Sequence, residues 1–144
     1  MSFTGLKQPI SQVLRVKFDF AANAPVGTED IGEIVEDPAL SGREEITVPA
    51  NEIWHIVDIY LEDDADLGAK DGYLDLIVNN LRQNLRFGPL KQTKKTLLNP
   101  IKLRQAIVVD RLSRISFVFK LREAMGASAG SNTITVEIVR IPVG

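Results

Sequence analysis

The sequence predicts an all-β fold, an antiparallel β-sandwich of about eight strands. Apolar residues alternate with polar ones in many short runs, which is the period of a half-buried strand. Turn residues such as Gly, Pro, Asn and Asp separate the runs at regular spacing. No segment shows a convincing helical period, so we expect turns and longer crossings of the Greek-key type between strands.

The expected central strand lies in the stretch 46–61, which holds a short strand, a turn at 49–51 and a long strand. Strict alternation gives the long strand two apolar faces, which are Ile53, Val57, Ile59 and Leu61 on one side and Trp54, Ile56 and Tyr60 on the other. A strand that is apolar on both sides is covered on both, or docks one side against a neighbour. The face with Trp54 is therefore either buried within the domain or a contact between subunits.

The other strands follow from alternating runs along the chain. The clearest is the first, in which Leu14, Val16, Phe18 and Phe20 share a face, and Ile115, Phe117 and Phe119 share one in a later run. The expected strands besides the central one are 14–20, 31–35, 73–78, 82–87, 101–108, 115–120 and 133–138. Asn79 and Asn80 end one of them. We expect residues 1–11 to form an N-terminal arm and residues 12–144 a single domain.

Composition excludes several kinds of chemistry. The chain has no cysteine, which excludes disulfides, zinc–thiolate sites and cysteine nucleophiles. Its beginning lacks a basic segment followed by an apolar run, so we expect no secretory signal. No apolar stretch reaches the roughly 20 residues that span a bilayer, so we expect no membrane span.

Charge is distributed unevenly along the chain. Residues 1–75 carry five Lys/Arg and sixteen Asp/Glu, a balance of −11, whereas residues 76–144 carry twelve and three, a balance of +9. Two interpretations stay open. Early and late strands are neighbours in the fold, so that the charges form cross-strand pairs. Alternatively, an acidic face of one subunit meets a basic face of the next.

Three sets of polar residues are candidates for a catalytic, metal-binding or nucleic-acid-binding site. His55 is the only histidine, and one histidine supplies neither a metal site nor, without a Gly-x-Ser-x-Gly elbow, a catalytic triad, so we expect a structural role and no cofactor. An acidic loop is a solvated turn, a calcium site or a subunit-contact site, and its carboxylates are Asp63, Asp64, Asp66 and Asp71. A basic connector contains Lys91, Lys94 and Lys95, near Lys102 and Arg104. Because exposed aromatic residues are missing beside it and the pI is about 5.4, nucleic-acid binding is not favoured.

Four phrases of the sequence carry a resemblance to a known family. They are TVPANEIW at 47–54, DGYLDLIVNN at 71–80, TLLNPIKL at 96–103 and NTITVEIVRIP at 132–142. In their order, these elements resemble small viral jelly-roll proteins, of the capsid, cement or tail-associated kind found in phages and archaeal viruses. The resemblance covers residues 44–142. It implies a single jelly roll, symmetric homo-oligomers and no catalysis.

The resemblance leads us to expect a structural, self-assembling component of a virus particle, and no enzyme. It would be a minor capsid, cement (decoration) or vertex/tail-associated protein, made in the host cytoplasm and located in the virion. Its partners would be copies of itself and other virion proteins. The expected contact residues are Trp54, Ile56, Tyr60, Lys91, Lys94 and Lys95. The alternative is a carbohydrate- or receptor-binding module that uses loops 62–72 and 124–132, with Tyr73 as the one candidate stacking platform.

Overall fold

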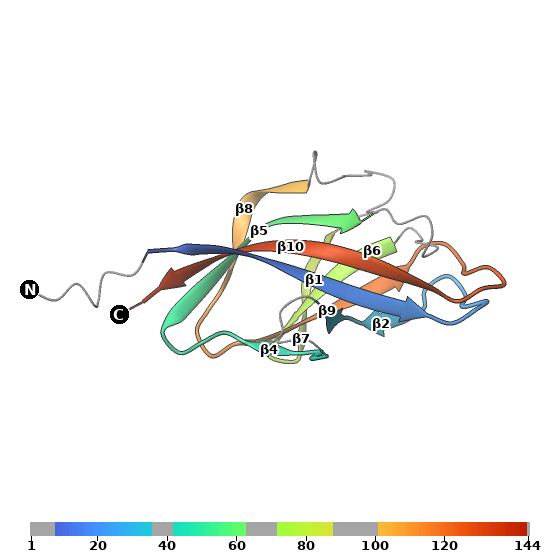
Figure 1. Cartoon of the computed structure of the whole chain (residues 1–144), viewed down its shortest axis with the longest axis horizontal. Helices are drawn as coiled ribbons and strands as arrows, with labels where there is room; N and C mark the ends of the chain where they lie inside the picture. Colours follow the sequence, from blue (N-terminus) through green and yellow to red (C-terminus); the bar gives the residue numbers. More distant parts are fainter. Residues whose placement is uncertain (1–7, 36–41, 63–71, 88–100, 144) are drawn as a thin grey trace, which may run out of the picture.

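The structure is a computed structural model that describes residues 8–35, 42–62, 72–87 and 101–143. In these residues the chain forms ten β-strands and no helix, arranged as two antiparallel sheets packed face to face, as the sequence predicts (Figure 1). The strands are β1 (Ile10–Phe20), β2 (Glu29–Ile31), β3 (Glu33–Ile34), β4 (Ile46–Thr47), β5 (Glu52–Glu62), β6 (Gly72–Val78), β7 (Leu81–Phe87), β8 (Ile101–Val109), β9 (Arg114–Leu121) and β10 (Gly130–Pro142). No helix long and apolar enough to cross a membrane occurs in this part of the chain.

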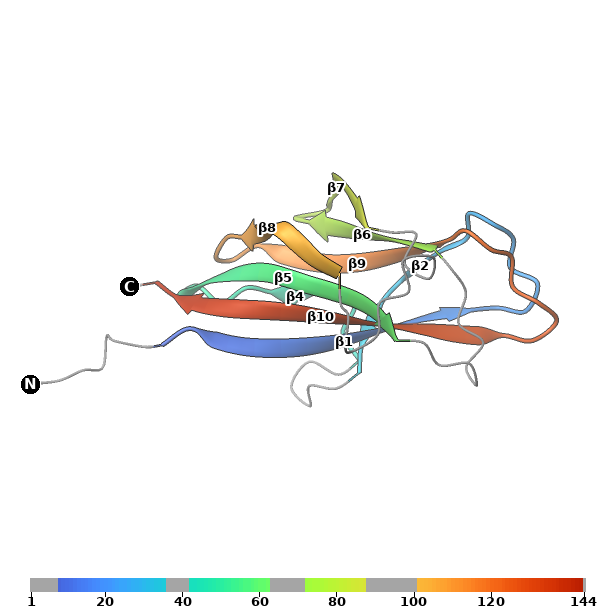
Figure 2. The ribbon, with the colours of Figure 1, turned by 90° about the horizontal axis from the view of Figure 1, so that it is seen from above.

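The two sheets have different strand orders. Sheet A has the order β3-β1-β10-β5-β8, and sheet B has the order β2-β9-β6-β7, with β4 also paired to β9. Figure 2 shows β1, β10 and β5 in one layer and β9, β6 and β7 in the other. Consecutive long strands therefore often lie in different sheets, as expected for Greek-key connections.

The pairing of the strands is that of a jelly roll, which confirms the predicted fold. Early strands pair with late strands in reverse order: β1 with β10, β2 with β9, β5 with β8, and β6 with β7. The chain is thus a long antiparallel ribbon rolled into a sandwich. The ribbon stays hydrogen-bonded where it passes between the sheets, because Met125 N donates to Ala24 O at 2.8 Å and Val48 N donates to Ser113 O at 2.9 Å.

The core lies between the sheets, and much of it follows the predicted alternation. Leu14, Val16, Phe18 and Phe20 of β1 are buried, as are Ile115, Phe117 and Phe119 of β9. The ring centroids of Phe18 and Phe119 are 5.5 Å apart, and those of Phe20 and Phe119 are 6.0 Å apart. These aromatic contacts join β1 of sheet A to β9 of sheet B.

The central strand β5 departs from the predicted alternation at Val57. Trp54 and Ile56 are 3% and 2% exposed and face the core, but so does Ile59, at 1%. On the neighbouring β10, Ile138 pairs with Ile56, and the residue before it, Glu137, pairs with Asp58. Val57 therefore has no partner on β10 and is the extra residue of a β-bulge. The prediction that Ile59 lies opposite Trp54 was therefore wrong, because an inserted residue reverses the alternation beyond it.

The short strand predicted at 31–35 is two strands in different sheets. β2 pairs with β9 in sheet B, and β3 pairs with β1 in sheet A. Gly32 makes the crossing, and its N donates to Phe117 O at 2.8 Å. A Cβ atom at residue 32 would lie 2.2 Å from Cγ1 of Val16 and 2.7 Å from Cε1 of Phe18. Only a glycine lets the backbone pass this close to the core side chains.

Candidate interaction surface

Figures 1 and 2 show the end of sheet A where β1 begins and β10 finishes. The outer side of the sheet carries an apolar surface at this end. We call it the terminal face, and it consists of Val13, Ile53, His55, Val108, Val139 and Ile141. Each residue alternates with an inward-facing neighbour on its strand. Val139 of β10 pairs with His55 of β5, which pairs with Val108 of β8. These three residues form a row across the sheet, Ile53 and Ile141 are paired in the row on one side of it, and Val13 lies opposite Glu137 in the row on the other side.

Exposure of this surface is substantial. Val13 is 46% exposed and Val108 is 60% exposed, while the other four members are partly exposed. No member carries a permanent charge, but Val13 is the direct cross-strand partner of Glu137, which pairs with Asp58. Among the side chains that the structure describes, the other large apolar ones that are exposed lie singly at strand ends and turns, and they are Ile10, Val26, Ile31, Leu81 and Leu112. Single exposed apolar residues are ordinary, whereas a contiguous group indicates an interaction site.

The outer side of sheet B is different, because an ion pair reaches across it. Arg82 of β7 donates to both carboxylate oxygens of Glu29 in β2, at 3.0 and 2.7 Å, although β6 and β9 separate these two strands. Nε of Arg82 also lies 3.7 Å from Oδ2 of Asp75, which is 2% exposed. The hydrogen bonds to Glu29 raise the pKa of Arg82 above its ordinary value, against the effect of desolvation. The outer side of sheet B therefore carries charged groups that are paired within the same molecule.

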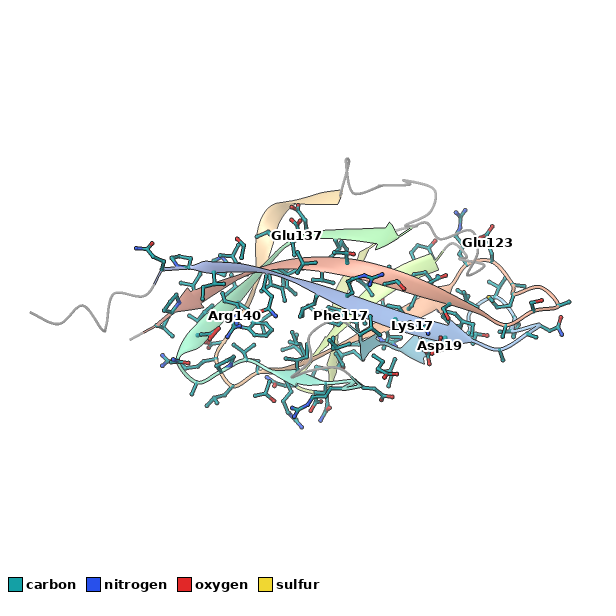
Figure 3. All side chains as sticks on the ribbon, viewed as in Figure 1. Lys17, Asp19, Phe117, Glu123, Glu137 and Arg140 are labelled. Carbon is teal, nitrogen blue, oxygen red and sulfur yellow. The ribbon has the colours of Figure 1, made fainter. Side chains whose placement is uncertain are left out.

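A polar network beneath the terminal face ties its strands together. Arg140 of β10 donates to both carboxylate oxygens of Glu52, at 2.5 and 2.7 Å, and to Oε1 of Gln12 in β1 at 2.9 Å (Figure 3). Its guanidinium carbon lies 5.5 Å from the ring centroid of Trp54, whose Nε1 donates to Glu52 at 3.0 Å. Three strands that carry the terminal face, β1, β10 and β5, are thus linked at one point.

The ion pairs bear on the uneven charge of the sequence. Glu29 with Arg82, Glu52 with Arg140, and Asp75 with Arg82 each join the acidic first half to the basic second half; Lys17 with Asp19 lies within the first half. Early strands pair with late strands throughout the ribbon, so opposite charges meet inside one molecule. Among the described residues, the charges therefore interleave, as in the first of the two interpretations.

Of the predicted contact residues, the structure describes the side chains of Trp54 and Ile56, which are not part of the terminal face. Trp54 and Ile56 are core residues, so of the two alternatives for their face the structure shows burial within the domain. Tyr60 lies in β5, but its side chain is outside the described part of the structure. The basic connector with Lys91, Lys94 and Lys95 and the acidic loop with Asp63, Asp64, Asp66 and Asp71 are outside it too, as are the side chains of Lys102 and Arg104.

The remaining predicted site residues occupy ordinary structural positions. Tyr73 is partly exposed and pairs with Lys120 on the outer side of sheet B. Within the described residues, no three His, Cys, Asp or Glu side chains are grouped so as to hold a metal ion, and each buried side-chain nitrogen or oxygen has a hydrogen-bond partner. Sequence reasoning missed Val13, Val108 and Val139. The available signal was a valine at an outward position of an alternating strand.

Comparisons with models of known protein families and with curated proteins found no match.

Proposed function

We propose that this chain is a structural protein that associates with copies of itself through the terminal face and serves as a component of a virus particle. The terminal face supports the first part of the proposal. The second part rests on the resemblance of four sequence phrases to small viral jelly-roll proteins, together with the jelly-roll pairing of the strands.

The contrast between the two outer faces carries the proposal of self-association. Sheet B is crossed by the bidentate contact between Arg82 and Glu29, which suits a face in water. Sheet A instead exposes the side chains of Val13 and Val108 beside those of Val139 and Ile141, without a permanent charge among them. Removing such side chains from water stabilises a complex by about 25 cal/mol per Å² of apolar area. Sheet A is therefore the face that gains from a partner.

The size of sheet A fits a second copy as that partner. β1, β10, β5 and β8 have 11, 13, 11 and 9 residues. At about 3.3 Å per residue and about 4.8 Å between strands, they cover roughly 700 Å². A standard interface buries about 800 Å² per partner, so a copy seated on this sheet would cover the terminal face at one end together with the charged strand surface beside it. Two identical faces related by a two-fold axis give the commonest closed assembly.

Light scattering coupled to size-exclusion chromatography tests self-association. We expect a mass that is a multiple of 15.9 kDa for the wild type, and 15.9 kDa for Val108→Lys. Val26→Lys is the matched control, because Val26 is a turn residue with an exposure of 62% against 60% for Val108. A wild type that is monomeric at every concentration overturns the proposal, as does equal loss of mass in both variants.

Sedimentation of virus particles tests the location in a virion. An antibody against the chain should detect it in the particle fraction released from the cells that produce it, and salt washes that leave the shell intact should retain it there. A chain found solely in fractions without particles would overturn this part of the proposal and leave self-association standing.

A further inference from the structure

We infer that His55 makes the self-association pH-dependent, so that copies joined through the terminal face separate when the imidazole is protonated. The inference rests on the proposed function and concerns the regulation of the same surface. Imidazole is the side chain whose charge ordinarily changes between about pH 5 and pH 8. The position of His55 in the sheet, rather than its mere presence, carries the inference.

His55 occupies the middle of the terminal face. In the row that crosses the sheet, Val139 of β10 is its partner on one side and Val108 of β8 is its partner on the other. Along β5, the next outward residue toward the end of the sandwich is Ile53, which pairs with Ile141. The imidazole is itself partly exposed. A copy that covers these apolar neighbours therefore covers the imidazole as well.

The register places charged residues in the rows next to His55. β10 contributes Glu137 and β5 contributes Asp58, both in the row away from the terminal end and paired with each other. β1 contributes Ser11, Val13 and, one row beyond Val13, Arg15. β8 contributes Val108 beside His55 and Lys102 opposite Asp58, although the side chain of Lys102 lies outside the described part of the structure. Arg140 and Glu52 belong to the network on the inner side of the sheet, beneath the face. In one copy, His55 thus has water over it, apolar side chains in its own row, and charged groups of both signs in the rows beyond.

Association replaces that water with the apolar face of the second copy. A neutral imidazole tolerates this change, but an imidazolium loses hydration, and moving a charge out of water is costly unless it is paired. A two-fold interface contributes every residue of the patch twice, so two imidazolium groups enter the same contact. Acid should therefore favour the separated copies.

Sedimentation equilibrium of the full chain at two pH values tests the inference. We expect the dissociation constant to be at least about tenfold larger at about pH 5.5 than at about pH 7.5 for the wild type, because each copy adds one imidazolium. The variant His55→Gln should show a ratio near one. Fluorescence of Trp54, the only tryptophan and a buried one, reports in both cases that the fold persists.

The outcomes separate this inference from the proposed function. A wild type that associates equally at both pH values overturns the inference and leaves self-association intact. A pH dependence that persists in His55→Gln assigns the effect to Asp58 and Glu137, and also overturns it. A wild type that is monomeric at both pH values overturns the proposed function and the inference together.

Discussion

Arg140 and Trp54 are direct partners across β10 and β5, and the guanidinium carbon of Arg140 lies 5.5 Å from the centre of the indole. Both groups also contact the same carboxylate, Glu52, which Trp54 reaches with its ring nitrogen. One end of the core is therefore covered by the ion pair of Arg140 and Glu52 and not by apolar side chains. This arrangement explains how a tryptophan can be buried at the end of the sandwich with its N–H satisfied.

Replacing Arg140 by alanine should destabilise the fold by about 1.5–3 kcal/mol, because it leaves Glu52, whose side chain is 15% exposed, without its ionic partner. Urea unfolding followed by Trp54 fluorescence measures this change. Arg140→Lys keeps the charge without the bidentate geometry, so its free energy of unfolding should lie between those of the wild type and Arg140→Ala. Arg111→Ala, at an exposed turn position, should change stability by less than about 0.5 kcal/mol. Equal effects of the Arg140 and Arg111 variants would contradict the role assigned to the network.

The contact between Arg82 and Glu29 should be worth less, because the two side chains are 42% and 34% exposed. A double-mutant cycle with Arg82→Ala and Glu29→Ala should give a coupling free energy of about 0.5–1 kcal/mol, and high salt should reduce it. The cycle separates this contact from the one between Arg82 and Asp75. A coupling of zero at low salt would show that the two edges of sheet B are not held together by this pair.

Gly32→Ala should destabilise the fold by about 1–3 kcal/mol or more, because the new methyl group would overlap Val16 and Phe18 in the core. Gly126→Ala is the matched control, since a Cβ atom there would meet no heavy atom within 4 Å. Thermal unfolding of the two variants side by side measures the difference. An unchanged melting temperature for Gly32→Ala would mean that the crossing between the sheets is looser than the structure shows.

Asn80→Gly should leave stability unchanged or raise it by a few tenths of a kcal/mol, whereas Asn80→Val should lower it by about 1–2 kcal/mol. Asn79 and Asn80 have φ angles of 51° and 65° and join β6 to β7 in a two-residue turn of type I′. Glycine adopts these angles freely, but a β-branched residue does not. Unfolding in denaturant measures both variants. If valine and glycine behaved alike, the left-handed conformation at residue 80 would be wrong.

The alternation of apolar residues was enough to predict the strands and the inward residues of β1 and β9, because that pattern is local. It could not reveal the bulge at Val57 or the crossing at Gly32. Both depend on the register with strands far along the chain, namely β10 for the bulge and β1 and β9 for the crossing. A strand-by-strand interpretation therefore placed Ile59 on the wrong side and merged β2 with β3.

The candidate surface was harder to predict than the fold for the same reason. Val13 and Val139 are separated by more than one hundred residues, and each resembles an isolated exception to the alternation of its own strand. They join into one surface only because β1 and β10 pair along their length. Trp54 was predicted as a contact residue because it is large and aromatic, yet large aromatic residues fill cores as readily as they fill interfaces.

The pairing of β1 with β10 also determines when sheet A can form as the chain leaves the ribosome. A ribosome releases the residues of β1 long before it has translated those of β10, which lie beside them from Ile10↔Arg140 to Phe20↔Gly130. Until then the nascent amino-terminal strand has an open edge along its whole length on that side, and such edges recruit other chains. The jelly roll therefore cannot close until β10 has left the ribosome, and the nascent chain is exposed to misassembly during that interval.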